Sequence, residues 1–131
     1  MYKRQHLLDA RITAEYYLTQ IVSHHSRGKV EAFLSEAARC GMTLPGMFGV
    51  FFYRSANAKT LKALGGFLPV PAEELTREFA AGASPEEVCA RSIHALTEAG
   101  VKHFYVSNLP LGRAASTLHR VLDLVNRRRT P

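Results

Sequence analysis

Residues 16–22 have the sequence YYLTQIV, in which β-branched and aromatic residues dominate. A short apolar run of this kind predicts a buried β-strand. A polar segment follows at residues 24–29, and beyond it apolar side chains recur at the spacing of one helix face, at Val30, Phe33, Leu34 and Ala37. Gly41 stands where a left-handed residue would end that helix. The sequence therefore predicts a strand, a loop and a helix in succession.

The same alternation of apolar strand and amphipathic helix continues along the chain. A second strand is predicted at residues 44–53 (LPGMFGVFFY), where Gly49 indicates a close backbone approach midway. A third strand is predicted at residues 103–107. Further helices are expected over 58–64 after the cap Asn57, over 71–79, from a capping box at 84–87 up to Gly100, and over 114–125. The predicted order is β-α-β-α-α-α-β-α.

This order predicts an α/β fold, in which parallel strands are joined by right-handed crossovers and covered by helices. A closed β/α barrel needs roughly 250 residues, so the 131 residues of this chain would make an incomplete one. We expect a single α/β domain over residues 6–126 and a basic tail at 127–131. The opening Met1-Tyr2-Lys3-Arg4-Gln5 resembles translated sequencing-adapter DNA, which predicts a non-native leader over residues 1–5.

The chain carries 17 Lys and Arg residues against 11 Asp and Glu residues, a formal net charge of +6, and 47% of its residues are hydrophobic. Part of the basic surplus lies in Lys3, Arg4 and residues 127–129, which argues against a nucleic-acid partner. No apolar run approaches the roughly 18 residues of a membrane-spanning helix, so we expect a cytoplasmic protein without a membrane partner. Cys40 and Cys89, far apart and within expected helices, are predicted to be buried free thiols.

Polar side chains gather where each predicted strand ends. In such folds the carboxyl ends of the strands carry the ligand groups, so we expect binding residues there. The three groups contain amide, hydroxyl, aromatic and guanidinium side chains and lack carboxylates, an inventory typical of a surface for a planar ligand. They comprise Thr19, Gln20, Ser23, His24 and His25, then residues 51–55 and Asn57, and then Tyr105, Ser107, Asn108 and Arg113.

Gln20 is the most informative of these residues, because a carboxamide in an apolar strand needs partners for both its donor and its acceptor. A ring system or a cofactor amide would supply them, and a core Gln20 bonded to neighbouring backbone is the alternative. Among the aromatic residues 51–53, Phe51 and Phe52 favour core packing, whereas Tyr53 needs a polar outlet for its hydroxyl.

The sequence supports a metal site or a catalytic nucleophile less than it supports a surface for a planar ligand. The adjacent His24 and His25 direct two rings poorly at one ion, and no carboxylate follows at ligand spacing, so no metal site is predicted. The sequence contains neither a G-x-S-x-G nucleophile elbow nor a G-x-G-x-x-G or P-loop phosphate-binding motif. Arg54 and Arg113 are each suited to bind a carboxylate or a phosphate.

Several of these segments together resemble the methylenetetrahydrofolate reductase family. The resemblance rests on the strand ending Leu18-Thr19-Gln20, on Leu44-Pro45-Gly46-Met47, on the strand Gly100-Val101-Lys102-His103-Phe104-Tyr105, and on Asn108 with the downstream Arg113. These motifs follow one another in the family's order from about residue 14 to residue 125. They correspond to the last three β/α units of that family's flavin-binding TIM barrel.

This resemblance implies a flavin-dependent oxidoreductase of one-carbon metabolism, in which hydride passes from NAD(P)H to FAD and then to methylenetetrahydrofolate, giving methyltetrahydrofolate. By the resemblance, Gln20 would be the catalytic residue and bind the folate ring and the nicotinamide in turn, since placement of the reacting atoms carries much of such catalysis. The family's flavin contacts belong mostly to preceding strands, so no flavin-binding residue is assigned and the chain alone is expected to be inactive. Further substrate contacts would come from Phe52 or Tyr53, Tyr105, Asn108 and Arg113.

The chain departs from the family pattern in three places. The family follows Pro-Gly with a short Pro-containing loop, whereas residues 47–55 differ from it, so the aromatic that would stack on the substrate has no unique match. An insertion separates Asn108 from Arg113, and the lysine that the family has before the Gln20 strand finds no match near residues 9–11. Two other functions stay open: a small basic α/β binding module without catalysis, and a related barrel enzyme with a different folate or deazaflavin ligand. Homo-oligomerisation of the complete protein is likewise open.

Overall fold

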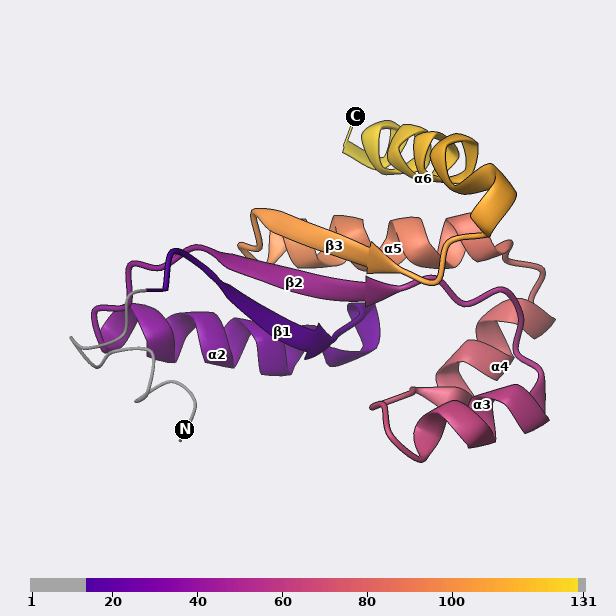
Figure 1. The fold of residues 1–131 in the computed structure, drawn as a ribbon, viewed down its shortest axis with the longest axis horizontal. Helices are drawn as coiled ribbons and strands as arrows, with labels where there is room; N and C mark the ends of the chain where they lie inside the picture. Colours follow the sequence, from indigo (N-terminus) through magenta and orange to yellow (C-terminus); the bar gives the residue numbers. More distant parts are fainter. Residues whose placement is uncertain (1–13, 130–131) are drawn as a thin grey trace.

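The computed structural model describes residues 14–129, which form an α/β fold around one parallel sheet (Figure 1). The leader expected at residues 1–5 lies outside the described residues. The predicted order of strands and α-helices, β-α-β-α-α-α-β-α, is confirmed. Along the chain the elements are β1 (Tyr17–Ile21), the 3-10 helix η1 (His24–Ser26), α2 (Arg27–Arg39), β2 (Gly46–Phe51), α3 (Ala58–Gly65), α4 (Ala72–Ala80), α5 (Pro85–Glu98), β3 (His103–Ser107), the 3-10 helix η2 (Leu111–Arg113) and α6 (Ala114–Arg129).

Several element boundaries differ from the expectation. The polar segment before α2 is not an open loop but coils into η1, because Ser23 and Ser26 cap each other through a Ser23 N–H bond to Ser26 Oγ of 2.9 Å. α2 therefore begins at Arg27. Pro71 is the N-cap of α4 and not part of its first turn. α6 continues through Arg129, so residues 127–129, expected in a tail, form its last turn.

The three strands are parallel and lie in the order β1-β2-β3, so strands consecutive in the chain are neighbours in the sheet. β2 and β3 pair in unbroken register. β1 holds one extra residue, because Leu18 pairs with Met47 and Ile21 pairs with Gly49. Such an irregularity bends a strand and re-aims the side chains beside it, and here it adjoins Gln20.

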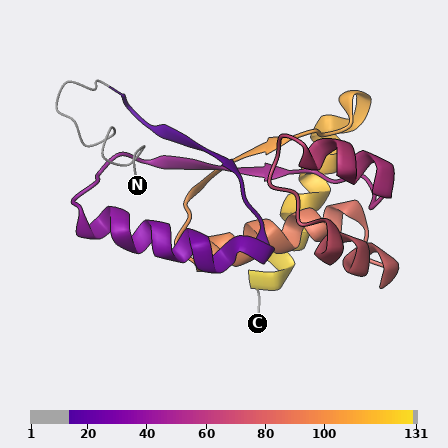
Figure 2. The ribbon, with the colours of Figure 1, turned by 90° about the horizontal axis from the view of Figure 1, so that it is seen from below.

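The main hydrophobic core lies between the sheet and three helices, α2, α5 and α6. From β2 and the residue after it, Phe48, Val50 and Phe52 alternate into this core with the two-residue period of a strand. Figure 2 shows α2 and α5 along the same face of the sheet. The buried residues contributed by the helices are Val30, Cys89, Ala90, Ile93, Leu96, Val121 and Val125.

A second, smaller core lies past the carboxyl ends of the strands, where α3 and α4 pack (Figure 1). It joins the segment after β2 to α3, α4 and the start of α5 through Tyr53, Leu61, Leu75 and Val88. The predicted cap Asn57 is confirmed, because its side chain accepts a backbone N–H in the first turn of α3. Two short helices are thereby held at the edge where ligand groups are expected.

The Tyr105 side chain crosses the central strand on the face opposite the main core. Gly49 of β2 leaves room for the ring, since a Cβ there would lie 2.6 Å from Tyr105 Cζ. The Tyr105 hydroxyl donates to the Thr19 carbonyl of β1, and Thr19 Oγ1 accepts the Gly49 N–H at 3.2 Å. The predicted close approach at Gly49 is confirmed, and through it all three strands are connected.

The two cysteines differ in their surroundings. Cys89 is 2% exposed in the main core, and burial raises the pKa of its thiol to about 12. Cys40 was expected to be buried too, but it is the C-cap residue of α2 and is only half-buried. Both thiols are free, as predicted.

Replacing Gly49 with alanine is expected to destabilise the fold, because the Tyr105 ring must move and its hydroxyl must leave the Thr19 carbonyl. Overpacking of this kind costs about 1–3 kcal/mol, which a urea titration followed by circular dichroism measures. Gly28→Ala is the matched control, since nothing lies within 4 Å of a Cβ there and alanine favours helix. Wild-type stability of Gly49→Ala would contradict the role given to this contact.

Candidate functional site

An open cavity of about 640 Å³ lies at the carboxyl end of β1, where ligand groups are expected. One part of its wall is formed by the end of β1, by η1 and by the first turn of α2. The other part is formed by Tyr53, which follows β2, and by the segment leading into α4. Parts of the chain that are far apart in sequence thus contribute to one surface. The polar side chains on this wall belong to Thr19, Gln20, Ser23, His25, Ser26, Lys29, Tyr53 and Glu74.

Gln20 is exposed on this wall, one residue before the end of β1. Its carboxamide makes no hydrogen bond to any residue in the described range 14–129. The alternative of a core glutamine bonded to neighbouring backbone therefore does not hold. An amide with both its donor and its acceptor unpaired can recognise a ligand group that offers the complementary pair.

Tyr53 forms another part of the wall and is 7% exposed, packed in the second core against Leu61, Leu75 and Val88. Burial raises the pKa of its phenol to about 12. Within the described part of the chain its hydroxyl has no hydrogen-bond partner. A buried phenol usually finds one, so a ligand in this cavity would supply the missing interaction.

Of the aromatic residues 51–53, Tyr53 alone lines the cavity. Phe52 lies in the main core at 3% exposure, where its ring has no access to a ligand in this cavity. Phe51 packs on Tyr53, with the two ring centroids 4.9 Å apart. Alternation thus turns Phe52 into the main core, and of the other two aromatic residues Tyr53 lines the cavity.

The other expected substrate residues lie away from the cavity wall. Tyr105 is partly buried and is engaged with the Thr19 carbonyl. Asn108 adopts a left-handed φ of 72° and its Nδ2 donates to the Phe52 carbonyl at 3.0 Å, so it closes the loop after β3. Arg113 is exposed in η2. The structure thus brings together Gln20 and Tyr53, but not Arg113.

One site residue, Glu78 of α4, was not anticipated from the sequence. Its carboxylate lies between the two histidines of η1, with Oε1 3.0 Å from His24 Nε2 and 2.6 Å from His25 Nε2. Arg91 of α5 donates to Oε2 at 2.7 Å. Glu78 is 54 positions from His24 in sequence, and no local spacing signals such a contact. The sequence has no carboxylate at ligand spacing from these histidines, and the structure instead brings one to them from α4.

The protonation states of Glu78 and His24 are determined by burial and by hydrogen bonds with their neighbours. Burial acts to raise the pKa of Glu78, but the bonds from Arg91 and His25, with those from His24, outweigh it, and the pKa is lowered. The pKa of His24 is lowered by burial first and by neighbouring His25 second. At neutral pH Glu78 is therefore ionised and the His24 ring is mostly uncharged.

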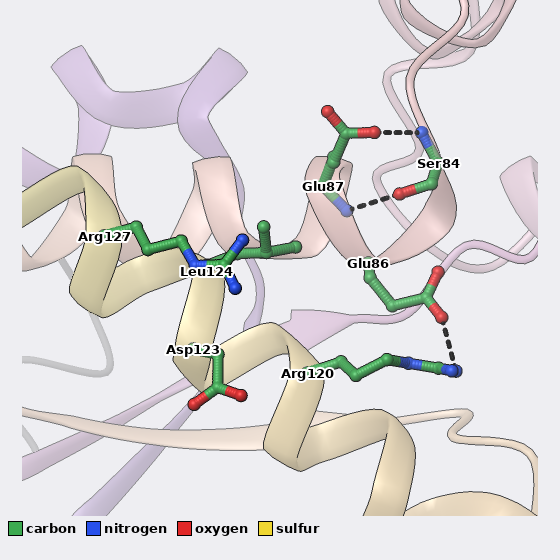
Figure 3. Close-up of a pocket in the computed structure, with 7 residues that line it drawn as sticks. All are labelled: Ser84, Glu86, Glu87, Arg120, Asp123, Leu124 and Arg127. Carbon is green, nitrogen blue, oxygen red and sulfur yellow. Dashed lines mark hydrogen bonds and ion pairs between the residues drawn. The ribbon is translucent and has the colours of Figure 1, made fainter.

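A second hollow, of about 380 Å³, lies between α5 and α6 (Figure 3). Its polar groups largely satisfy one another. Ser84 and Glu87 form the predicted capping box of α5, and Arg120 is paired with Glu86 at 2.7 Å. Because four of its polar side chains, Ser84, Glu86, Glu87 and Arg120, already have partners, the cavity at the end of β1 is the better candidate for ligand binding.

Comparisons with known proteins add no family assignment. No protein-family model matches the chain, and neither the curated proteins nor the solved structures give a match. Among the helices of residues 14–129, none is long and apolar enough to cross a membrane.

The buried phenol of Tyr53 makes stability depend on pH at the alkaline end. Its pKa is about 12 in the folded protein and about 10 in the unfolded chain, so the unfolded state loses the proton first. Between about pH 10 and pH 12 the free energy of unfolding is expected to fall by roughly 2–3 kcal/mol through Tyr53.

The measurement compares the wild type with Tyr53→Phe, by denaturant titration at each pH and by the ultraviolet absorbance of tyrosinate. Tyr53→Phe should lose the ionisation near pH 12 and this part of the stability loss. Tyr16→Phe is the control, because Tyr16 is 51% exposed and its removal should leave the late ionisation in place. Burial also raises the pKa of Tyr17, so part of the late ionisation remains in Tyr53→Phe. A late ionisation of the same amplitude in Tyr53→Phe and in the wild type would refute the assignment.

Proposed function

We propose that this chain is the C-terminal part of a flavin-dependent reductase of the methylenetetrahydrofolate reductase type. The observation that carries the proposal is the pairing of Gln20 and Tyr53 on one cavity wall, at the carboxyl ends of two adjacent strands. A carboxamide and a buried phenol that have no hydrogen-bond partner within residues 14–129 suit a flat polar heterocycle. The family resemblance of the surrounding segments supports the same ligand class.

The strand arrangement supports the proposal at the level of the fold. In a β/α barrel, each strand is flanked by its sequence neighbours, and the helices form the outer layer. The order β1-β2-β3, with α2, α5 and α6 packed on one face, has this character. We propose that these are the last three β/α units of such a barrel. The opposite face, which carries Leu18 at 61% exposure and Tyr105, would then point to its interior.

Within the proposed site, the residues on the wall have distinct tasks. Gln20 would hydrogen-bond the ring edge of the folate and the carboxamide of the nicotinamide in turn, and thereby orient each for hydride transfer. Tyr53 would present its hydroxyl and ring edge to the bound heterocycle. Lys29, which lines the cavity in the first turn of α2, is better situated than Arg113 for the acidic tail of a folate.

The flavin would supply the hydride-carrying chemistry of this reaction, with FAD as the bound cofactor and NAD(P)H as co-substrate. No residue of the described chain is assigned to holding FAD. What the chain contributes in this proposal is recognition and orientation of the two successive ligands. The chain by itself is therefore expected to bind weakly and not to turn over.

Ligand binding by the chain tests the proposal. We expect methyltetrahydrofolate, added to isotope-labelled protein, to shift the amide NMR signals of Gln20, Lys29 and Tyr53. Nicotinamide mononucleotide should compete for the same signals. Gln20→Ala should weaken folate binding about 3- to 10-fold, the effect of losing one net hydrogen bond.

Lys59→Ala serves as the control, because Lys59 is exposed on α3 and does not line the cavity. Signals that shift only outside the cavity, or equal affinity of the wild type and Gln20→Ala, would count against a folate site at Gln20. Binding without competition by the nicotinamide would favour a barrel enzyme with a different second ligand.

A further inference from the structure

A compact group of metal-ligating side chains lies beside the cavity, at the contact of η1 with α4. We infer that His24, His25 and Glu78 form a binding site for a divalent transition metal of the Zn²⁺ class. The three side chains offer two imidazole nitrogens and one carboxylate oxygen, all within 4.8 Å of one another. This inference does not depend on the proposed reductase function.

The donor set selects the class of metal. Imidazole suits Zn²⁺, Co²⁺, Ni²⁺ and Cu²⁺, whereas Mg²⁺ and Ca²⁺ require oxygen ligands nearly throughout. Two histidines and one glutamate are a ligand set of catalytic zinc centres, which keep a fourth position for water or substrate. The chemistry of the three side chains therefore favours Zn²⁺ over the alkaline-earth ions.

The side chains are already close to the geometry that a metal needs. His24 Nε2 lies 3.0 Å from both oxygens of Glu78, and His25 Nε2 lies 2.6 Å from Oε1. Ligands bound to zinc at about 2.0–2.1 Å in a tetrahedron are roughly 3.3 Å apart, so modest side-chain movements would admit the ion. The three side chains are 17%, 21% and 13% exposed, which limits competition from water.

Neighbouring groups hold the ligands in the way that metal sites require. Ser92 Oγ lies 2.8 Å from His24 Nδ1, which leaves Nε2 of that ring directed at Glu78. Arg91 binds the Glu78 Oε2 atom at 2.7 Å, and Oε1 stays between the two rings. Such outer partners fix the orientation of metal ligands. Arg91 and Ser92 both belong to α5, so one helix supports both ligands.

The position of His25 gives the site an opening. His25 also lines the 640 Å³ cavity, together with Lys29. Three protein ligands leave one position of a tetrahedral ion for water or an anionic ligand, as in catalytic zinc centres. Of the three side chains, His25 is the one that lines the cavity, so a ligand in the cavity would approach the ion from the side of His25.

Metal titration of the tag-free chain tests the inference. We expect one equivalent of Co²⁺ to give the visible absorption of a four-coordinate ion, displaced by Zn²⁺, and Zn²⁺ to raise the melting temperature. His25→Ala and Glu78→Gln should each lower Zn²⁺ affinity at least about tenfold, and Ser92→Ala should lower it about 10- to 100-fold. Circular dichroism establishes that each variant is folded.

His119→Ala is the matched control, because His119 is exposed on α6, outside the cluster. It should keep wild-type affinity, as should Gln20→Ala, which separates this test from that of the folate site. Wild-type Zn²⁺ affinity in both His25→Ala and Glu78→Gln would overturn the inference. So would a Co²⁺ spectrum without four-coordinate bands, or a loss of affinity in His119→Ala as large as in His25→Ala.

Discussion

The hydroxyl of Tyr105 reaches across the central strand to the carbonyl of Thr19, and the arrangement of the sheet depends on this contact. β1 and β3 are not neighbours and share no ladder, so the tyrosine is a direct link between the two edge strands. The link is possible because Gly49 carries no side chain where the ring passes. Since Thr19 immediately precedes Gln20, the same contact fixes the strand end on which the candidate site is built.

At the carboxyl end of the sheet, the carboxylate of Glu78 connects η1, α4 and α5, much as Tyr105 connects the strands. It contacts His24 and His25 of η1 and Arg91 of α5 from its own position on α4. A carboxylate at 13% exposure would be unfavourable alone, and the guanidinium at 2.7 Å offsets that cost. The result is a fixed separation between η1 and α4, which both contribute residues to the cavity wall.

The sequence was sufficient to predict the structural features that depend on local chemistry. The order of elements, the cap Asn57, the Ser84 capping box and the close approach at Gly49 were all predictable, because each depends on residues a few positions apart or on one side chain's size. Contacts between distant segments were not. The approach of Glu78 to His24, 54 positions away, follows only from how α4 packs. The exposure of Gln20 was not predictable either, because its apolar neighbours in the strand indicate a buried side chain.

The wall of the cavity is divided into an uncharged and a charged part, and this division bears on both proposals. Gln20 and Tyr53 present an amide and a phenol whose raised pKa keeps it neutral, whereas Lys29, Glu74 and the side of His25 present charge or metal-binding capacity. A ligand complementary to both parts would combine a flat polar ring with an ionised group. A metal ion at His25 would add positive charge to the second part only. Because Lys29 and Glu74 carry opposite charges, such an ion would give the second part a positive surplus. The two sites would then together favour an anionic heterocycle, whose ring and charge would bind different residues.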